Sequence, residues 1–154
     1  MKGNPGVITL LNQQLESELA AGQQYTLHAA IQANDGYGKL AEHSAKEASE
    51  EAAHARRLMD RILFLEGVPK VGMKLKVRTG ETVPLQHQAD LEAELEAVKT
   101  YAAAAIEAEN AGDVGTRDLF ASILHDEEEH VDWLEKQLSL IEDVGLENYL
   151  IYRI

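Results

Sequence analysis

Apolar side chains recur every three or four positions along four long stretches of the chain, which is the spacing of one face of an α-helix. The second stretch is the plainest case, because Leu40, Leu58 and Ile62 fall on one stripe together with Glu51 and His54. Glycine-containing segments such as "NDGYG" and "NAGD" separate the stretches. The pattern predicts helices at about 5–34, 39–65, 84–111 and 115–142, and a short fifth helix at about 146–152.

A long segment without helical periodicity, "GVPKVGMKLKVRTGETV", joins the second stretch to the third at residues 67–83. Connections of this length are unusual in a compact domain. If the second and third helices are parallel, the link must climb roughly 37 Å, and an extended chain of this length reaches roughly 56 Å. The sequence therefore predicts an all-α four-helix bundle with a long crossover between helices two and three, formed as a single domain over residues 1–154.

Charged and imidazole groups occupy mid-helix positions on these apolar stripes. A carboxylate on a buried stripe is costly unless another group pairs with it. Two of the groups are histidines placed three positions after a glutamate, so each such pair shares one helix face. A Glu-x-x-His spacing alone also fits an ordinary solvated helix face. The six groups are Glu18, Glu51, His54, Glu94, Glu127 and His130.

An internal repeat relates the two halves of the chain. A constant offset of 76 positions separates the members of several pairs, including the glycines of the two turns. The two glutamates of each predicted hairpin are also equidistant from its turn, which places them at the same height in an antiparallel pair. Packing two such hairpins together brings the six side chains to one centre. The pairs are Glu18/Glu94, Glu51/Glu127, His54/His130, Tyr25/Tyr101 and Gly36/Gly112.

Four carboxylates and two imidazoles cannot share a buried centre at neutral pH without large pKa shifts. Two divalent cations resolve the conflict, because four positive charges then balance four negative ones. Oxygen donors combined with imidazole suit iron or manganese. One glutamate from each of two helices, with a Glu-x-x-His pair from each of the others, is the ligand set of ferritin-like di-iron and di-manganese proteins. The sequence thus predicts a two-metal centre within one chain, with all six residues as ligands.

Composition narrows the classes of function further. The formal net charge of the 154 residues is −13, which argues against nucleic acid as a partner and suits the attraction of cations. Cysteine is absent, so disulfides and thiolate metal sites are excluded. There is neither a signal-peptide pattern nor an apolar run long enough to cross a bilayer. We therefore expect no membrane partner and a cytoplasmic location.

Several segments resemble the bacterioferritins, and the likeness extends over nearly the whole chain. The segments are the opening "MKG", "RILFLEG" at 61–67, "DEEEHVDWLEKQLSLI" at 126–141 and "GLENYL" at 145–150. The resemblance implies a ferritin-like bundle and a ferroxidase that stores and detoxifies iron. It implies that O₂ or H₂O₂ oxidises Fe²⁺ and that ferric mineral collects inside a hollow shell of twenty-four subunits. A ferredoxin-type reductant is a further partner that it implies.

The resemblance also implies a role for each ligand candidate. Two carboxylates would bridge two irons, two would be terminal ligands, and each histidine would bind one iron, giving two irons per subunit. Tyr25 matches a tyrosine near the family's centre, where it would supply an electron or a hydrogen bond, although a core aromatic fits its position equally well. The bridging pair is Glu51 and Glu127, the terminal pair is Glu18 and Glu94, and the histidines are His54 and His130.

Position 52 departs from the family pattern. The resemblance places a haem-ligating methionine directly after the glutamate of the first Glu-x-x-His, but this chain has Ala52 there, which has no donor atom. We expect a homo-oligomer without haem, or a mixed shell in which another subunit type supplies the ligand. Lys46 stands where the family often has a histidine, which argues against an accessory iron site. Glu47 and Glu50 are candidates for guiding iron inward.

Other histidines and aromatic residues carry no such pattern. Because His28, His43, His87 and His125 lack carboxylates at suitable spacing, we expect them at surface or interface positions. Glu128 and Glu129, which follow Glu127, are expected to be solvated. The aromatic residues Trp133 and Tyr149 are expected to serve in packing or as interface anchors.

Four other classes of protein share parts of this pattern. A rubrerythrin-like peroxidase needs cysteines for its electron-transfer domain, and this chain has none. Ferritins that coat DNA build their centre between subunits, whereas here one chain carries all six ligand candidates. A di-iron or di-manganese oxidoreductase that acts on peroxide without storing iron remains an alternative, because the ligand set does not select iron. A purely structural helical bundle is the other alternative.

Overall fold

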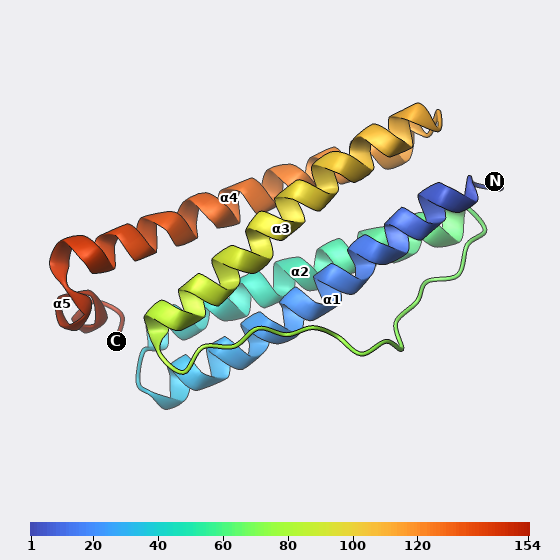
Figure 1. Ribbon diagram of the computed structural model, residues 1–154. Coiled ribbons are helices and arrows are strands. Elements are labelled where there is room, and N and C mark those ends of the chain that lie inside the picture. Colours follow the sequence, from blue (N-terminus) through green and yellow to red (C-terminus); the bar gives the residue numbers. More distant parts are fainter.

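The computed structural model describes all residues, 1–154, and contains five helices and no strand (Figure 1). The predicted all-α bundle is confirmed, and each helix begins and ends within two residues of its expected range. None of the helices is both long enough and apolar enough to cross a membrane. The helices are α1 (Pro5–Asn34), α2 (Gly38–Phe64), α3 (Val83–Asn110), α4 (Val114–Val144) and α5 (Leu146–Ile151).

Two antiparallel hairpins make up the bundle, α1 with α2 and α3 with α4, and α1 also packs against α3 (Figure 1). Each hairpin turns at a glycine with a positive φ, which is 88° at Gly36 and 75° at Gly112. This left-handed conformation suits glycine because in other residues the Cβ atom would crowd the neighbouring backbone. The two turns are therefore equivalent in conformation as well as in their place in the sequence repeat.

Side-chain caps fix where two of the helices begin. At the start of α1, the side chain of Asn4 accepts a hydrogen bond of 2.8 Å from the Gly6 amide. Asp113 accepts one of 2.9 Å from the Thr116 amide at the start of α4. Asp113 also lies 2.6 Å from Arg61 of α2, so one carboxylate caps α4 and ties it to the other hairpin.

The crossover, residues 65–82, runs along the length of the bundle from the end of α2 near the N-terminus to the start of α3 (Figure 1). Side chains of α1 supply hydrogen bonds to its backbone. Asn12 donates to the Val68 carbonyl at 3.2 Å and accepts from the Lys70 amide at 2.8 Å. Gln24 accepts from the Arg78 amide at 2.8 Å. These bonds satisfy backbone groups of the crossover, which has no regular secondary structure, and hold it against α1.

The interior divides into an apolar half and a polar half. The apolar half lies toward the free ends of the first hairpin and the turn of the second, and includes Leu11, Leu15, Leu58, Ile62 and Phe120. The polar half lies toward the turn of the first hairpin, and its buried members include Gln24, His28, Gln32, Ser44, Gln86 and Asp90. The six ligand candidates lie between the two halves in all four long helices.

Two histidines expected at surface or interface positions are instead in the core. His28 is 0% exposed, with its Nδ1 atom 2.9 Å from an oxygen of Asp90. His87 is 2% exposed, packs edge-on against Trp133, and lies 3.1 Å from the Tyr149 hydroxyl. The expectation was wrong because the partner of each histidine comes from a different helix, which spacing within one helix cannot show.

The remaining expectations for this group agree better with the structure. His125 is exposed, and His43 is partly buried and stacks on Trp133 with ring centroids 3.7 Å apart. Tyr149 is buried and donates a hydrogen bond of 3.0 Å to Gln137. Trp133 and Tyr149 thus take part in packing, as expected, and help to hold α5 against α4. Glu128 and Glu129 are exposed.

Candidate metal centre

Side chains from all four long helices meet at mid-bundle, at the boundary between the apolar and polar halves. Each of the six residues singled out from the sequence is buried, with exposed fractions from 1% to 8%. In α2 and α4, a glutamate and the histidine three positions later share one helix face, so both point to the same centre. From α1 and α3, Glu18 and Glu94 each bring one further carboxyl group to the centre.

His54 lies at the heart of one group of donor atoms. Its Nδ1 atom is 3.4 Å from Glu18, 3.5 Å from Glu51 Oε2 and 3.1 Å from Glu127 Oε1. The four residues place one donor atom each within 4.8 Å of one another. We call this group the first half-site.

His130 occupies the corresponding place in a second group, which we call the second half-site. Its Nδ1 atom is 3.5 Å from Glu94, 3.4 Å from Glu51 Oε1 and 3.1 Å from Glu127 Oε2. Glu51 and Glu127 therefore give one oxygen to each half-site. The two imidazole rings face each other across the centre, with centroids 6.4 Å apart.

Acidic side chains also lie beside the Nε2 atom of each imidazole, which we call the outer nitrogen because Nδ1, the inner nitrogen, faces the half-site. His54 Nε2 lies 3.1 Å from Asp126, whereas His130 Nε2 lies 2.9 Å from Glu47 and 3.1 Å from Glu50. Such partners orient a histidine and leave its other nitrogen free to bind a metal. Sequence reasoning missed Asp126, although it stands 76 positions after Glu50 and so follows the internal repeat.

Two tyrosines support the terminal carboxylates across the hairpins. Tyr25 of the first hairpin donates a hydrogen bond of 2.5 Å to Glu94 of the second. Tyr101 of the second hairpin donates a hydrogen bond to Glu18 of the first. Tyr25 is thus both a buried aromatic and a hydrogen-bond donor at the centre. Tyr101 was paired with Tyr25 by the repeat, but the sequence did not reveal its contact with Glu18.

The four carboxyl groups at the centre are of two kinds, because burial acts on all of them in the same direction but their contacts differ. Burial raises the pKa of Glu18 and of Glu94 well above the usual range, and the nearby charge of Glu51 adds to both shifts. For the two shared carboxylates burial acts in the same direction but is outweighed. Contacts with Glu18 and His130 lower the pKa of Glu51, and contacts with the two histidines lower that of Glu127. The terminal groups therefore tend to be neutral, and the shared groups charged.

The histidines complete this balance. Burial disfavours the charged form of His54, but contacts with Glu127 and Glu18 outweigh it and raise the pKa to about 12. Burial is likewise outweighed at His130, where Glu127 and Glu47 raise the pKa well above its usual range. Without a metal, two imidazolium ions therefore balance two carboxylates. With two divalent cations, the protons would leave and four carboxylates would balance four positive charges.

Several side-chain oxygen and nitrogen atoms that could bind a metal at the centre have no hydrogen-bond partner. Carboxyl or imidazole groups lie 3.1–3.5 Å from them. Buried polar atoms without partners are rare in folded proteins, and each calls for an explanation. Here the atoms belong to carboxylates and imidazoles, which are donors that iron and manganese accept. The residues present therefore fit two metal ions. The atoms are Glu18 Oε2, Glu51 Oε1, both oxygens of Glu127, His54 Nδ1 and His130 Nδ1.

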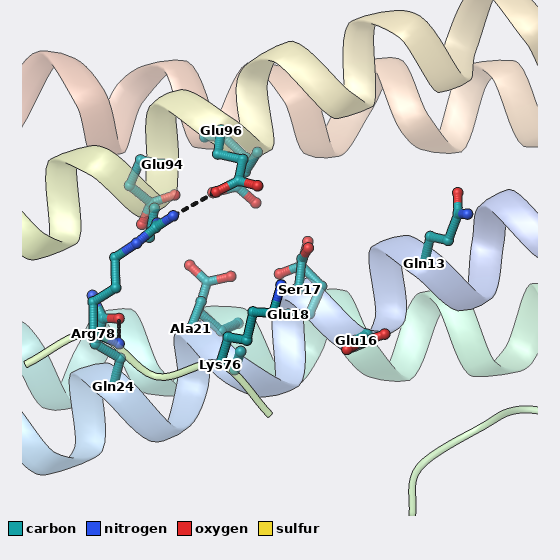
Figure 2. Close-up of a pocket in the computed structure, with 15 residues that line it drawn as sticks. Gln13, Glu16, Ser17, Glu18, Ala21, Gln24, Lys76, Arg78, Glu94 and Glu96 are labelled. Carbon is teal, nitrogen blue, oxygen red and sulfur yellow. Dashed lines mark hydrogen bonds and ion pairs between the residues drawn. The ribbon is translucent and has the colours of Figure 1, made fainter. Parts of the chain in front are cut away.

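A pocket of about 290 Å³ connects this centre with solvent between α1 and α3 (Figure 2). Four of the six candidates line it, namely Glu18, Glu51, Glu94 and Glu127. The crossover contributes Lys76 and Arg78 to its wall. Ions and small molecules thus have a route from solvent to both half-sites.

Comparison with known proteins places the chain in a family. The model of the ferritin-like domain matches residues 8–144. A bacterioferritin of Mycolicibacterium paratuberculosis is 43% identical over 149 residues, covering 97% of this chain and 94% of its own. A bacterioferritin of Streptomyces coelicolor is 43% identical over 150 residues, covering 97% and 90%. A bacterial ferritin of Synechocystis is 44% identical over 151 residues, covering 97% of both chains. The chain therefore belongs to the ferritin-like family and, within it, to the bacterioferritins.

Proposed function

We propose that the protein is a ferroxidase that stores and detoxifies iron. The single observation that carries this proposal is the sharing of Glu51 and Glu127, each of which gives one oxygen to each half-site. Shared carboxylates hold two cations close together while each keeps its own histidine and terminal glutamate. That arrangement suits a reaction in which two Fe²⁺ ions are oxidised as a pair.

The residues of each half-site would bind one Fe²⁺ as substrate. Glu18 and His54 complete the first half-site, and Glu94 and His130 complete the second. Two Fe²⁺ ions supply two electrons, which is the number needed to reduce O₂ to H₂O₂ or H₂O₂ to two water molecules. The protons displaced from the terminal glutamates and the histidines are released as the ions bind. The outer carboxylates keep both imidazoles oriented throughout.

Storage needs an enclosed space, and we propose that the chain assembles into a hollow shell of twenty-four subunits in which ferric mineral collects. The named relatives that match it over nearly its whole length are bacterioferritins, which supports this assembly. Large apolar side chains stay exposed on the single chain, including Leu63, Phe64, Ile106 and Ile151. Exposed apolar groups of this kind are typical of contact surfaces between subunits. Size-exclusion chromatography with mass detection tests the assembly.

Haem does not fit the residues around position 52. Ala52 lies in a groove of about 590 Å³ between α1 and α2, lined in part by Leu19, Gly22, Leu27 and Ala48. No methionine, histidine, cysteine, lysine or tyrosine lines this groove, so no usual axial ligand of haem iron is present. We propose that the homo-oligomer is free of haem, and that any haem in a mixed shell is ligated by another subunit type. A haem absorption band with one haem per two chains in the pure homo-oligomer would contradict this.

Substitution of ligand candidates tests the ferroxidase directly. We expect Glu18→Ala and His130→Ala to slow Fe²⁺-dependent oxygen consumption strongly while the assembly stays intact, because these side chains serve the centre. Glu128→Ala is the matched control, since Glu128 is exposed on the same helix as His130. Unchanged oxidation rates in both ligand variants would refute the proposal. Peroxide turnover with manganese and without iron accumulation would favour the non-storage oxidoreductase instead.

A further inference from the structure

Most charged side chains of the crossover are basic, and they are exposed. Over residues 73–78, partly buried apolar residues alternate with the exposed basic residues Lys74, Lys76 and Arg78. Lys70 is a further exposed basic residue. On a chain with a formal net charge of −13, such a basic run needs a reason. Two of these residues, Lys76 and Arg78, line the pocket that leads to the candidate metal centre.

Arg78 spans the opening of this pocket. Its guanidinium Nη2 atom lies 2.6 Å from a carboxylate oxygen of Glu96 on α3, which links the crossover to the far wall (Figure 2). Figure 2 shows the side chain reaching across in front of Glu94, a candidate ligand. The ion pair is partly exposed, with side-chain exposures of 42% and 63%, so it adds little to stability. Its position over the pocket is the feature that matters.

Buried groups fix the backbone that carries Arg78. The Arg78 amide donates to Gln24 of α1, and the Gln24 side chain donates to Asp90 of α3 at 2.7 Å. The same carboxylate holds His28, which accepts a hydrogen bond of 3.3 Å from the Gly80 amide. The crossover is therefore attached on both sides of residue 79. Arg78 cannot leave the opening without breaking buried hydrogen bonds, although its side chain can rotate away from Glu96.

We propose that Arg78 and Glu96 form a charged gate that sets how fast divalent cations reach the metal centre. This inference deepens the proposed function and rests on it. An unpaired guanidinium at the opening repels an incoming cation, and Glu96 offsets that repulsion while the ion pair is closed. Neither residue is a candidate ligand, so each acts on the incoming cation only through its charge at the opening.

We expect the rate of metal uptake to change in opposite directions when each charge of the gate is removed separately. Arg78→Gln removes a positive charge from the opening and is expected to speed metal uptake about three- to tenfold at low ionic strength. Glu96→Gln leaves Arg78 unpaired and is expected to slow uptake by a similar factor. Arg56→Gln is the matched control, because it breaks an exposed ion pair of α2, with Asp60 at 2.9 Å, that does not line the pocket.

Stopped-flow measurement of Co²⁺ binding to the full assembly, followed by its visible absorption bands, tests the gate without any oxidation step. Equilibrium titration first establishes two Co²⁺ per chain in every variant. The expected result is faster uptake in R78Q, slower uptake in E96Q and no change in R56Q, with the differences shrinking as salt rises. Two Co²⁺ per chain with equal rates, or with shifts of the same sign in R78Q and E96Q, would overturn the gate alone. Failure of the unaltered protein to bind Co²⁺ would overturn the proposed function and the gate with it.

Discussion

Around His54 the outer imidazole nitrogen meets one carboxylate, that of Asp126, whereas around His130 it meets two, those of Glu47 and Glu50. The inner nitrogens, in contrast, have equivalent surroundings, namely one terminal glutamate and one oxygen from each shared glutamate. The two half-sites thus present the same donors to a metal ion but surround them differently. The internal repeat preserves the ligands and one outer carboxylate at each half-site, but not the second outer carboxylate beside His130.

The repeat shows where this difference arises. Asp126 stands 76 positions after Glu50, so each half-site has one outer carboxylate from this pair. The position 76 after Glu47 is Ile123, which is 0% exposed and belongs to the apolar core. A carboxylate on the outer nitrogen makes an imidazole a stronger metal donor. We therefore expect the second half-site to bind its cation more tightly than the first.

The largest expected effect separates shared ligands from terminal ones. Glu127→Ala removes an oxygen from both half-sites, so we expect loss of both bound metals and of nearly all Fe²⁺ oxidation. Glu18→Ala removes a donor from the first half-site only, so we expect one metal per chain to remain. Metal analysis after equilibrium dialysis against Zn²⁺ measures the difference. Equal stoichiometry in the two variants would show that Glu127 is not shared.

A second expected effect concerns pH and applies to both half-sites. In the metal-free centre, the raised pKa values of Glu18 and Glu94 and those of both histidines favour the protonated form of each group. Each group must lose its proton to bind a metal, so raising the pH strengthens binding. We expect about two protons released per metal, and an affinity that rises about 100-fold per pH unit between roughly pH 6 and 8.

Calorimetric titration with Zn²⁺ in buffers of different ionisation enthalpy counts these protons. The count is expected to be similar for the two half-sites, because each contains one terminal glutamate and one histidine with a raised pKa. Release of fewer than one proton per metal would mean that the metal-free centre does not hold the protons assigned to it.

A smaller effect should follow from removal of the additional outer carboxylate. Glu47→Gln keeps the shape of the side chain but removes its charge beside His130, so we expect the tighter metal to bind about tenfold more weakly. The weaker metal should be little affected, because Glu47 does not contact His54. Glu128→Gln, an exposed change on α4, is the control. If both binding steps weaken equally in Glu47→Gln, the proposed inequality of the half-sites is wrong.

Much of the fold was accessible from the sequence because long amphipathic helices leave a strong periodic signal. In α2, the stripe from Leu40 through Glu51 and His54 to Ile62 is buried at every predicted position. The distances of the glutamates from each turn placed the charged groups of a hairpin at one height, and the repeat of 76 positions related the two hairpins, which periodicity alone cannot do. The sequence could therefore indicate which six residues converge, but not the further contacts around them.

Contacts between segments without a shared periodicity could not be anticipated. The core pair of His28 and Asp90 joins α1 to α3, and neither helix alone shows why a histidine should be buried. The ion pair of Arg78 with Glu96 depends on the path of an irregular crossover, which has no period to reveal its register. Partners of this kind follow from how the elements pack, and packing is set by the whole bundle.

Anomalous diffraction at the iron absorption edge, from crystals soaked anaerobically in Fe²⁺, would locate the iron bound within each chain. We expect two peaks within each chain. One peak should lie beside His54 Nδ1 and Glu18, the other beside His130 Nδ1 and Glu94, and both should contact Glu51 and Glu127. A single peak, or peaks only at the exposed acidic side chains, would contradict a centre built from two half-sites with shared carboxylates.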